Sequence, residues 1–165
     1  MAIDTLRRLL LLILLCLVQV LVLNRIQLFN CATPLLYVYF IVIFPRSYPR
    51  WAILLWSFTL GIVMDMFNNT PGVAAASTTL IGFLQPYLLE LFLPREAEVN
   101  IKSSAKQLGW RNFIFLAAIL VSIYCLTFFV IEIFTFSDWH YWLQCAGSSA
   151  LLTFLLMISL ESTRK

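Results

Sequence analysis

Two long apolar runs joined by a very short turn constrain this chain more than any other feature. The runs cover residues 51–67 and 73–93, and the residues between them are 68–72, Asn-Asn-Thr-Pro-Gly. These residue types favour turns, because Asn and Gly tolerate a left-handed backbone and Pro fixes its own φ angle. A connection this short permits only an antiparallel pair, so the sequence predicts a helical hairpin.

The composition places this hairpin in a membrane rather than in a soluble domain. Hydrophobic residues make up 62% of the 165 residues and charged residues 12%, whereas soluble domains contain about half and about a quarter, respectively. Six helices of about 20 residues would use roughly 120 residues and leave only short loops and tails. No soluble catalytic domain fits in the remainder, and we expect one polytopic domain over residues 1–165.

The apolar runs predict an all-α membrane protein with six transmembrane helices. The first run follows two arginines but lacks an A-x-A-like cleavage pattern, so we interpret it as a retained helix rather than a signal peptide. The second is barely long enough to cross a bilayer, with Pro34 near its start and Pro45 at its end. The predicted helices are at about 6–23, 28–44, 51–67, 73–93, 110–136 and 141–160.

The distribution of Lys and Arg favours a topology with both termini in the cytoplasm. Six spans with this orientation put ten basic residues inside and leave Arg25 alone outside. Cytoplasmic loops of membrane proteins carry such an excess. Removing the short second span reduces the split to nine and two, so the charge bias also supports that span.

This topology brings Arg25, Asp65 and Glu132 to the outer side of the membrane. A carboxylate in a membrane-length apolar run is costly unless it faces protein, water or a partner. Two interpretations of Asp65 stay open. In one, Asp65 and Glu132 form an outer polar pocket with Arg25 as the counter-ion. In the other, Asp65 is hydrated at the membrane surface and caps the hairpin turn.

No motif in the sequence is typical of an enzyme. The chain contains no GxSxG, no HExxH and no glycine-rich phosphate loop. Its four cysteines lack metal-ligand spacing and are expected to behave as small hydrophobic residues, with a disulfide between Cys31 and Cys145 disfavoured. We therefore expect a non-enzymatic protein without a cofactor or a metal site.

The basic residues of the chain are interpreted mainly as orientation signals. Arg46 with Arg50, and Lys102 with Lys106, are too sparse for a polybasic lipid-recognition cluster. A general attraction to membrane lipid accounts for them, and no nucleic-acid partner is expected.

Residues 61–82 carry a resemblance to a known family. Gly61 and Asp65 form a GxxxD pattern in one apolar run, and Pro71, Gly72 and a run of small residues follow after the turn. In this pattern, and in its length and hydropathy, the chain resembles MreD, the rod shape-determining membrane protein. The resemblance implies a fold similar to the S components of energy-coupling-factor transporters.

The resemblance also implies a function and a location. The expected protein is a scaffold subunit of the cell elongation machinery in the bacterial cytoplasmic (inner) membrane. It would bind an MreC-like single-pass membrane protein and act indirectly with MreB, RodA and penicillin-binding synthases in peptidoglycan synthesis. Gly61, Asp65, Pro71 and Gly72 would form a partner-binding or structural hairpin. The alternative is a vitamin-type S component-like subunit of a transporter, which would bind a small molecule in the outer polar pocket.

Overall fold

The protein is all-helical, as the sequence predicts. The computed structural model describes residues 2–23, 34–93, 108–132 and 139–163. This part of the chain contains six helices and no strand. The helices are α1 (Ala2–Leu21), α2 (Val38–Val42), α3 (Arg50–Asn68), α4 (Val73–Phe92), α6 (Trp110–Glu132) and α7 (Trp139–Thr163).

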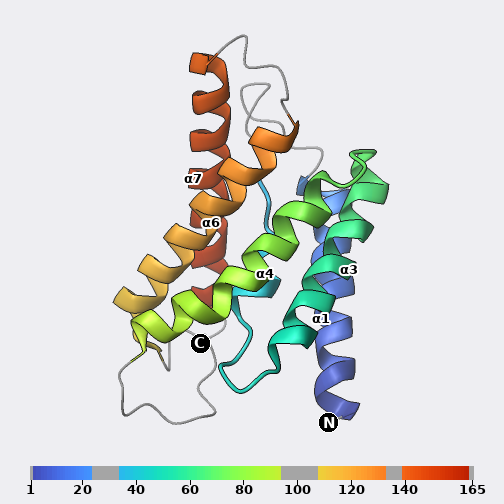
Figure 1. The fold of residues 1–165 in the computed structure, drawn as a ribbon, viewed down its shortest axis with the longest axis vertical. Coiled ribbons are helices and arrows are strands. Elements are labelled where there is room, and N and C mark those ends of the chain that lie inside the picture. Colours follow the sequence, from blue (N-terminus) through green and yellow to red (C-terminus); the bar gives the residue numbers. More distant parts are fainter. Residues whose placement is uncertain (1, 24–33, 94–107, 133–138, 164–165) are drawn as a thin grey trace.

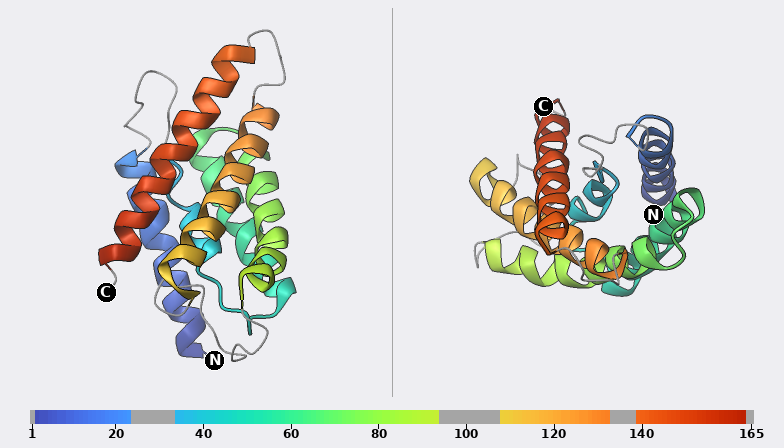
Figure 2. Two further views of the ribbon diagram at one scale, coloured as in Figure 1. Left: turned by 90° about the vertical axis from the view of Figure 1, so that its left-hand side faces the viewer. Right: turned by 90° about the horizontal axis from the view of Figure 1, so that it is seen from above.

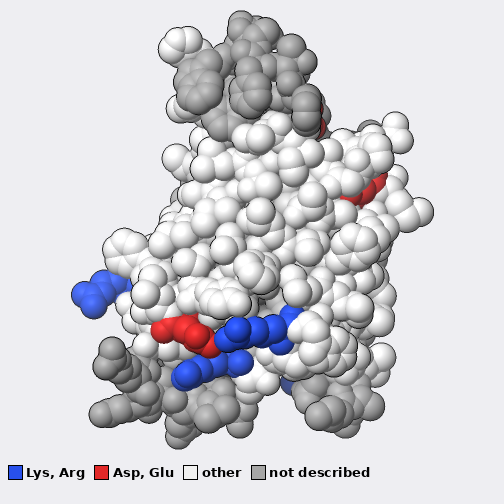
Figure 3. Space-filling model, viewed as in Figure 1, with Lys and Arg blue, Asp and Glu red and all other residues white. Residues whose placement is uncertain are grey.

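Several of these helices have the character of membrane spans. By length and composition, α3, α6 and the Leu143–Thr163 part of α7 can each cross a membrane. Large apolar side chains point away from the bundle, among them Leu55, Leu126 and Leu151. On the face drawn in Figure 3, an uncharged belt separates a charged cluster at one end from acidic residues near the other. These features support the predicted membrane class.

The long helices surround α2. The long helices contact one another in sequence: α1 packs against α3, α3 against α4, α4 against α6, and α6 against α7. The short helix α2 packs against α1, α4 and α6. Viewed from above, α2 lies inside the ring of longer helices (Figure 2). Both chain ends lie at one end of the molecule, here called the basal end (Figure 1). The turn between α3 and α4, the end of α6 and the start of α7 lie at the opposite end, here called the hairpin end.

The predicted helix over 28–44 is wrong in its described part. Residues 34–37 are irregular or form a turn, and only Val38–Val42 is helical. Five residues rise about 7.5 Å, which is too short for a helical span. The residues before 34 lie outside the described part of the chain. The count of six helical spans is therefore not confirmed.

Side chains from two distant helices explain why this segment is buried without being a helix. Gln19 of α1 donates from Nε2 to the Pro34 carbonyl at 2.6 Å and accepts from the Leu36 N–H at 3.0 Å. Thr153 of α7 accepts from the Leu35 N–H at 3.0 Å. Irregular backbone is tolerated at membrane depth where protein satisfies its polar groups, and α1 and α7 do so here.

The other five predicted helices are present. Their described ends lie within four residues of the predicted ones, and the predicted end at 136 lies outside the described residues. In α4 the helix continues through Pro86. The expectation for the cysteines is wrong at one position: Cys145 is disulfide-bonded, with its partner outside the described residues. Cys16 and Cys125 are free and buried.

Candidate functional site: the α3–α4 hairpin

The turn between α3 and α4 uses the two residue types that tolerate a left-handed backbone. Asn69 ends α3 with φ 56° and Gly72 precedes α4 with φ 87°. The Thr70 N–H donates to the Asp65 carbonyl at 3.2 Å, and the Asn69 N–H donates to the same oxygen. The local sequence thus closes α3 and starts α4 within a few residues.

The Asp65 carboxylate caps the beginning of α4. Its Oδ1 accepts from the Ala74 N–H at 2.8 Å and from Thr70 Oγ1 at 3.1 Å. Its Oδ2 accepts from the Ala75 N–H at 2.9 Å and from the Gly72 N–H at 3.1 Å. The first N–H groups of a helix have no partner within the helix and form the positive end of its dipole. Asp65, only 7% exposed, therefore joins the two helices by neutralising that end.

Small residues bring α3 and α4 into direct backbone contact. A Cβ atom on Gly61 would lie 2.3 Å from Thr78 Oγ1 and 2.4 Å from the Ala75 Cα. A Cβ atom on Gly82 would lie 2.3 Å from Ser57 Oγ. Membrane helices associate closely where such residues meet. Gly61 and Gly82 thus allow α3 and α4 to pack closely at two levels of the hairpin.

An apolar groove runs along the outer surface of this hairpin. It consists of two adjoining hollows of about 460 and 590 Å³ that share Phe58, Gly72 and Ala75. Its small residues lie between larger side chains that are well exposed, such as Phe58 at 50% and Phe83 at 54%. We call this the hairpin groove. Its principal residues are Phe58, Ile62, Met66, Gly72, Ala75, Ala76, Thr79, Leu80 and Phe83.

The structure brings one predicted set of site residues together. Gly61 lies in the α3–α4 contact, and Asp65, Pro71 and Gly72 line the upper part of the hairpin groove. Because the Asp65 carboxylate is hydrogen-bonded within the hairpin, its contacts favour the capping interpretation.

The predicted outer polar pocket is not tested as a whole by the described residues. Glu132 is exposed at the end of α6 and does not line the hairpin groove. Arg25 lies outside the described residues. Within the described ranges, no three His, Cys, Asp or Glu residues come together as a metal site. A pocket shared by Arg25, Asp65 and Glu132 stays a prediction.

Several residues of the site are not singled out by the sequence patterns. Ser57 and Gly82 form the second close contact of the hairpin, and Phe58 and Phe83 flank the groove. A signal for the first pair was present, since each is a small residue within an apolar run. The phenylalanines gave no such signal, because their meeting depends on how the two helices are rotated.

Comparison with protein families, curated proteins and solved structures gives no match. Any function of the chain is therefore inferred from the residues of the hairpin and from their geometry.

Proposed function

We propose that the protein is a non-enzymatic scaffold subunit of the bacterial cell elongation machinery, of the MreD type. Its role would be to bind an MreC-like single-pass membrane protein. Through that partner it would help to position MreB, RodA and the penicillin-binding synthases during peptidoglycan synthesis. The observation that carries the proposal is the hairpin groove, which has the form of a site for one membrane helix.

The residues of the groove suit helix docking. Gly72, which precedes α4, lies four residues before Ala76, and Ala75 lies four residues before Thr79. All four residues share the grooved surface. Small residues at this spacing allow the backbone of a second membrane helix to come close, where dispersion and weak hydrogen bonds stabilise the pair. Phe58 and Phe83 would contact the partner helix from its two sides.

The cap at Asp65 keeps this surface apolar. A buried charge without a partner would oppose the docking of a membrane helix. The carboxylate instead accepts four hydrogen bonds from its own hairpin. In this proposal Asp65 holds the docking surface in shape, and the partner helix contacts the small and aromatic residues below it.

The proposed orientation places the hairpin end outside the cytoplasm, in the bacterial cytoplasmic membrane. The chain would cross six times, with residues 34–44 making the second crossing and both termini inside. Three observations support this topology: the two chain ends lie together (Figure 1), basic residues are concentrated on one predicted side, and Cys145 of α7 is disulfide-bonded. Disulfides persist in oxidising compartments such as the periplasm.

Photocrosslinking in native membranes tests the docking site. A photoreactive residue at Ala76 or Thr79 is expected to capture a single-pass cell-wall protein with the properties of MreC. The same residue at Leu155, which is 55% exposed on α7, provides the control and is expected to capture lipid. Capture of lipid alone at all three positions would contradict the docking proposal. A small molecule that copurifies with the protein, identified by mass spectrometry, would favour the transporter alternative.

A blocking variant gives a quantitative version of the same test. Ala76→Phe fills the groove at an exposed position, so it is expected to weaken partner recovery in a pull-down by about ten-fold, or about 1.4 kcal/mol. Thr59→Phe, at an exposed position on α3 that does not line the groove, is the matched control. Equal recovery with the two variants would refute the role of the groove.

A further inference from the structure

A second cavity lies at the basal end, away from the hairpin groove. It has a volume of about 250 Å³, is more enclosed than the groove, and lies between residues 45–50 and the later turns of α4. We call it the basal pocket. The lining side chains that matter here are Arg46, Tyr48, Arg50, Gln85, Pro86 and Glu90.

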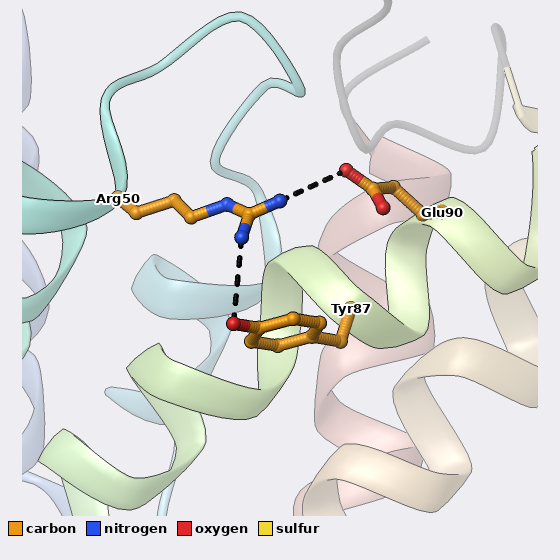
Figure 4. A network of polar contacts seen from close by, with 3 residues as sticks. All are labelled: Arg50, Tyr87 and Glu90. Atoms are coloured by element: carbon orange, nitrogen blue, oxygen red, sulfur yellow. Dashed lines mark hydrogen bonds and ion pairs between the residues drawn. The ribbon is translucent and has the colours of Figure 1, made fainter.

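One of the two arginines in the basal pocket is compensated within the protein. Arg50 Nη2 lies 3.4 Å from Glu90 Oε1, and Arg50 Nη1 donates to the Tyr87 hydroxyl at 3.4 Å (Figure 4). The guanidinium carbon also lies 4.9 Å above the Tyr87 ring. Arg46 is exposed and forms no ion pair with any residue that the structure describes. The described pocket wall therefore carries two positive charges and one negative charge.

A third guanidinium and a helix N-terminus lie beside the basal pocket. Arg8 of α1 lies 4.1 Å above the ring of Tyr48, which lines the basal pocket. The pocket also adjoins the beginning of α3, the positive end of that helix dipole. Among the described lining residues, Arg46, Arg50 and the adjoining helix N-terminus thus outweigh the carboxylate of Glu90, and the pocket attracts an anion.

The position of the basal pocket identifies the source of that anion. Trp51 follows Arg50 in the chain, and Tyr87 contacts Arg50; they are 70% and 46% exposed. Trp and Tyr concentrate where the hydrocarbon core meets the lipid headgroups. The charged cluster of Figure 3 borders the uncharged belt at this same end. The pocket therefore lies at the level of the headgroups.

We propose that the basal pocket binds the phosphate of an anionic membrane lipid. Arg46 would pair with the phosphate, and Arg50 would contribute while it remains partly engaged by Glu90. The acyl chains would extend toward the uncharged belt. This site is independent of the proposed scaffold function, because it lies at the other end of the hairpin from the turn and needs no protein partner.

Native mass spectrometry of the full chain, exchanged with vesicles of phosphatidylglycerol or phosphatidylcholine, tests the proposal. Arg46→Gln is expected to reduce retention of phosphatidylglycerol about five-fold, the effect of about 1 kcal/mol per basic residue at a membrane surface. Glu90→Gln is expected to increase retention, because it removes the opposing charge and releases Arg50. Arg111→Gln removes another exposed arginine, at the beginning of α6, and is expected to change little.

Three results would overturn the proposal. Equal losses for Arg46→Gln and Arg111→Gln would show general surface attraction rather than a pocket. Equal retention of the two lipids would show that the anionic headgroup is not recognised. Inorganic phosphate added at millimolar concentration is expected to leave the lipid bound, and full displacement would assign the site to a soluble phosphate instead.

Discussion

Removal of the Asp65 carboxylate tests whether this residue stabilises the hairpin. In Asp65→Ala the N–H groups of Ala74 and Ala75, both in buried hydrogen bonds, lose their acceptors. Loss of a helix N-cap costs about 0.5–2 kcal/mol, and each buried N–H left without a partner costs about 1–3 kcal/mol. We expect the free energy of unfolding to fall by about 3 kcal/mol.

The assay is reversible unfolding of the purified chain in detergent micelles, followed by the fluorescence of its tryptophans. Asp65→Asn keeps one acceptor oxygen, but its NH₂ group faces an N–H donor, so we expect it to lose about half as much stability. Glu90→Ala is the matched control because it removes a carboxylate from the same hairpin. That carboxylate forms an exposed ion pair with Arg50, and such pairs contribute about 0.2–1 kcal/mol.

The comparison has a clear negative outcome. If Asp65→Ala and Glu90→Ala lower the free energy of unfolding equally, within about 0.5 kcal/mol, the cap does not stabilise the hairpin. The outer polar pocket would then become the favoured interpretation of Asp65. Amide hydrogen exchange gives a local check, since exchange at Ala74 and Ala75 should accelerate in Asp65→Ala and not in Glu90→Ala.

Three further predictions follow from the packing. Gly61→Ala places a methyl group against the backbone of α4 and should lower the free energy of unfolding by about 1–3 kcal/mol. Gly147→Ala, at a position with open space around it, should be neutral or stabilising. Equal effects of the two variants would refute the close contact. Gln19→Leu removes both hydrogen bonds to residues 34–36 and should cost about 2 kcal/mol in the same assay; wild-type stability would show that this clamp is unimportant. Cys145 should react with a maleimide in the denatured chain only after reduction, as peptide mass spectrometry can show; labelling without a reductant would contradict its disulfide.

The hairpin could be predicted from sequence because its determinants are local. Asn69 and Gly72 adopt the left-handed backbone that their residue types favour, and the apolar runs on either side set the lengths of α3 and α4. The position of Asp65 at the join was also evident. Its hydrogen bonds were not, because a carboxylate at this depth suits either a cap or a polar pocket.

The rest of the fold depends on contacts between distant residues. The helix predicted over 28–44 does not form over residues 34–36, because Gln19 and Thr153 make hydrogen bonds with their backbone groups. In a helix these groups would bond to one another. The pattern of residues 28–44 contains no sign of those two side chains. The same reason hides the basal pocket, since Arg46 and Arg50 look sparse until the fold brings Gln85, Pro86 and Glu90 of α4 beside them.

The clamp on residues 34–36 has a consequence for biogenesis. A hydrogen-bonded helix can enter the bilayer from the translocon as soon as it has been synthesised, but an irregular segment would expose its backbone polar groups to lipid. The Leu35 N–H has its partner in Thr153, 118 residues later in the chain. Residues 34–36 can therefore become stably buried only after the ribosome has completed α7. A nascent chain that stops before α7 should remain a substrate for quality-control proteases.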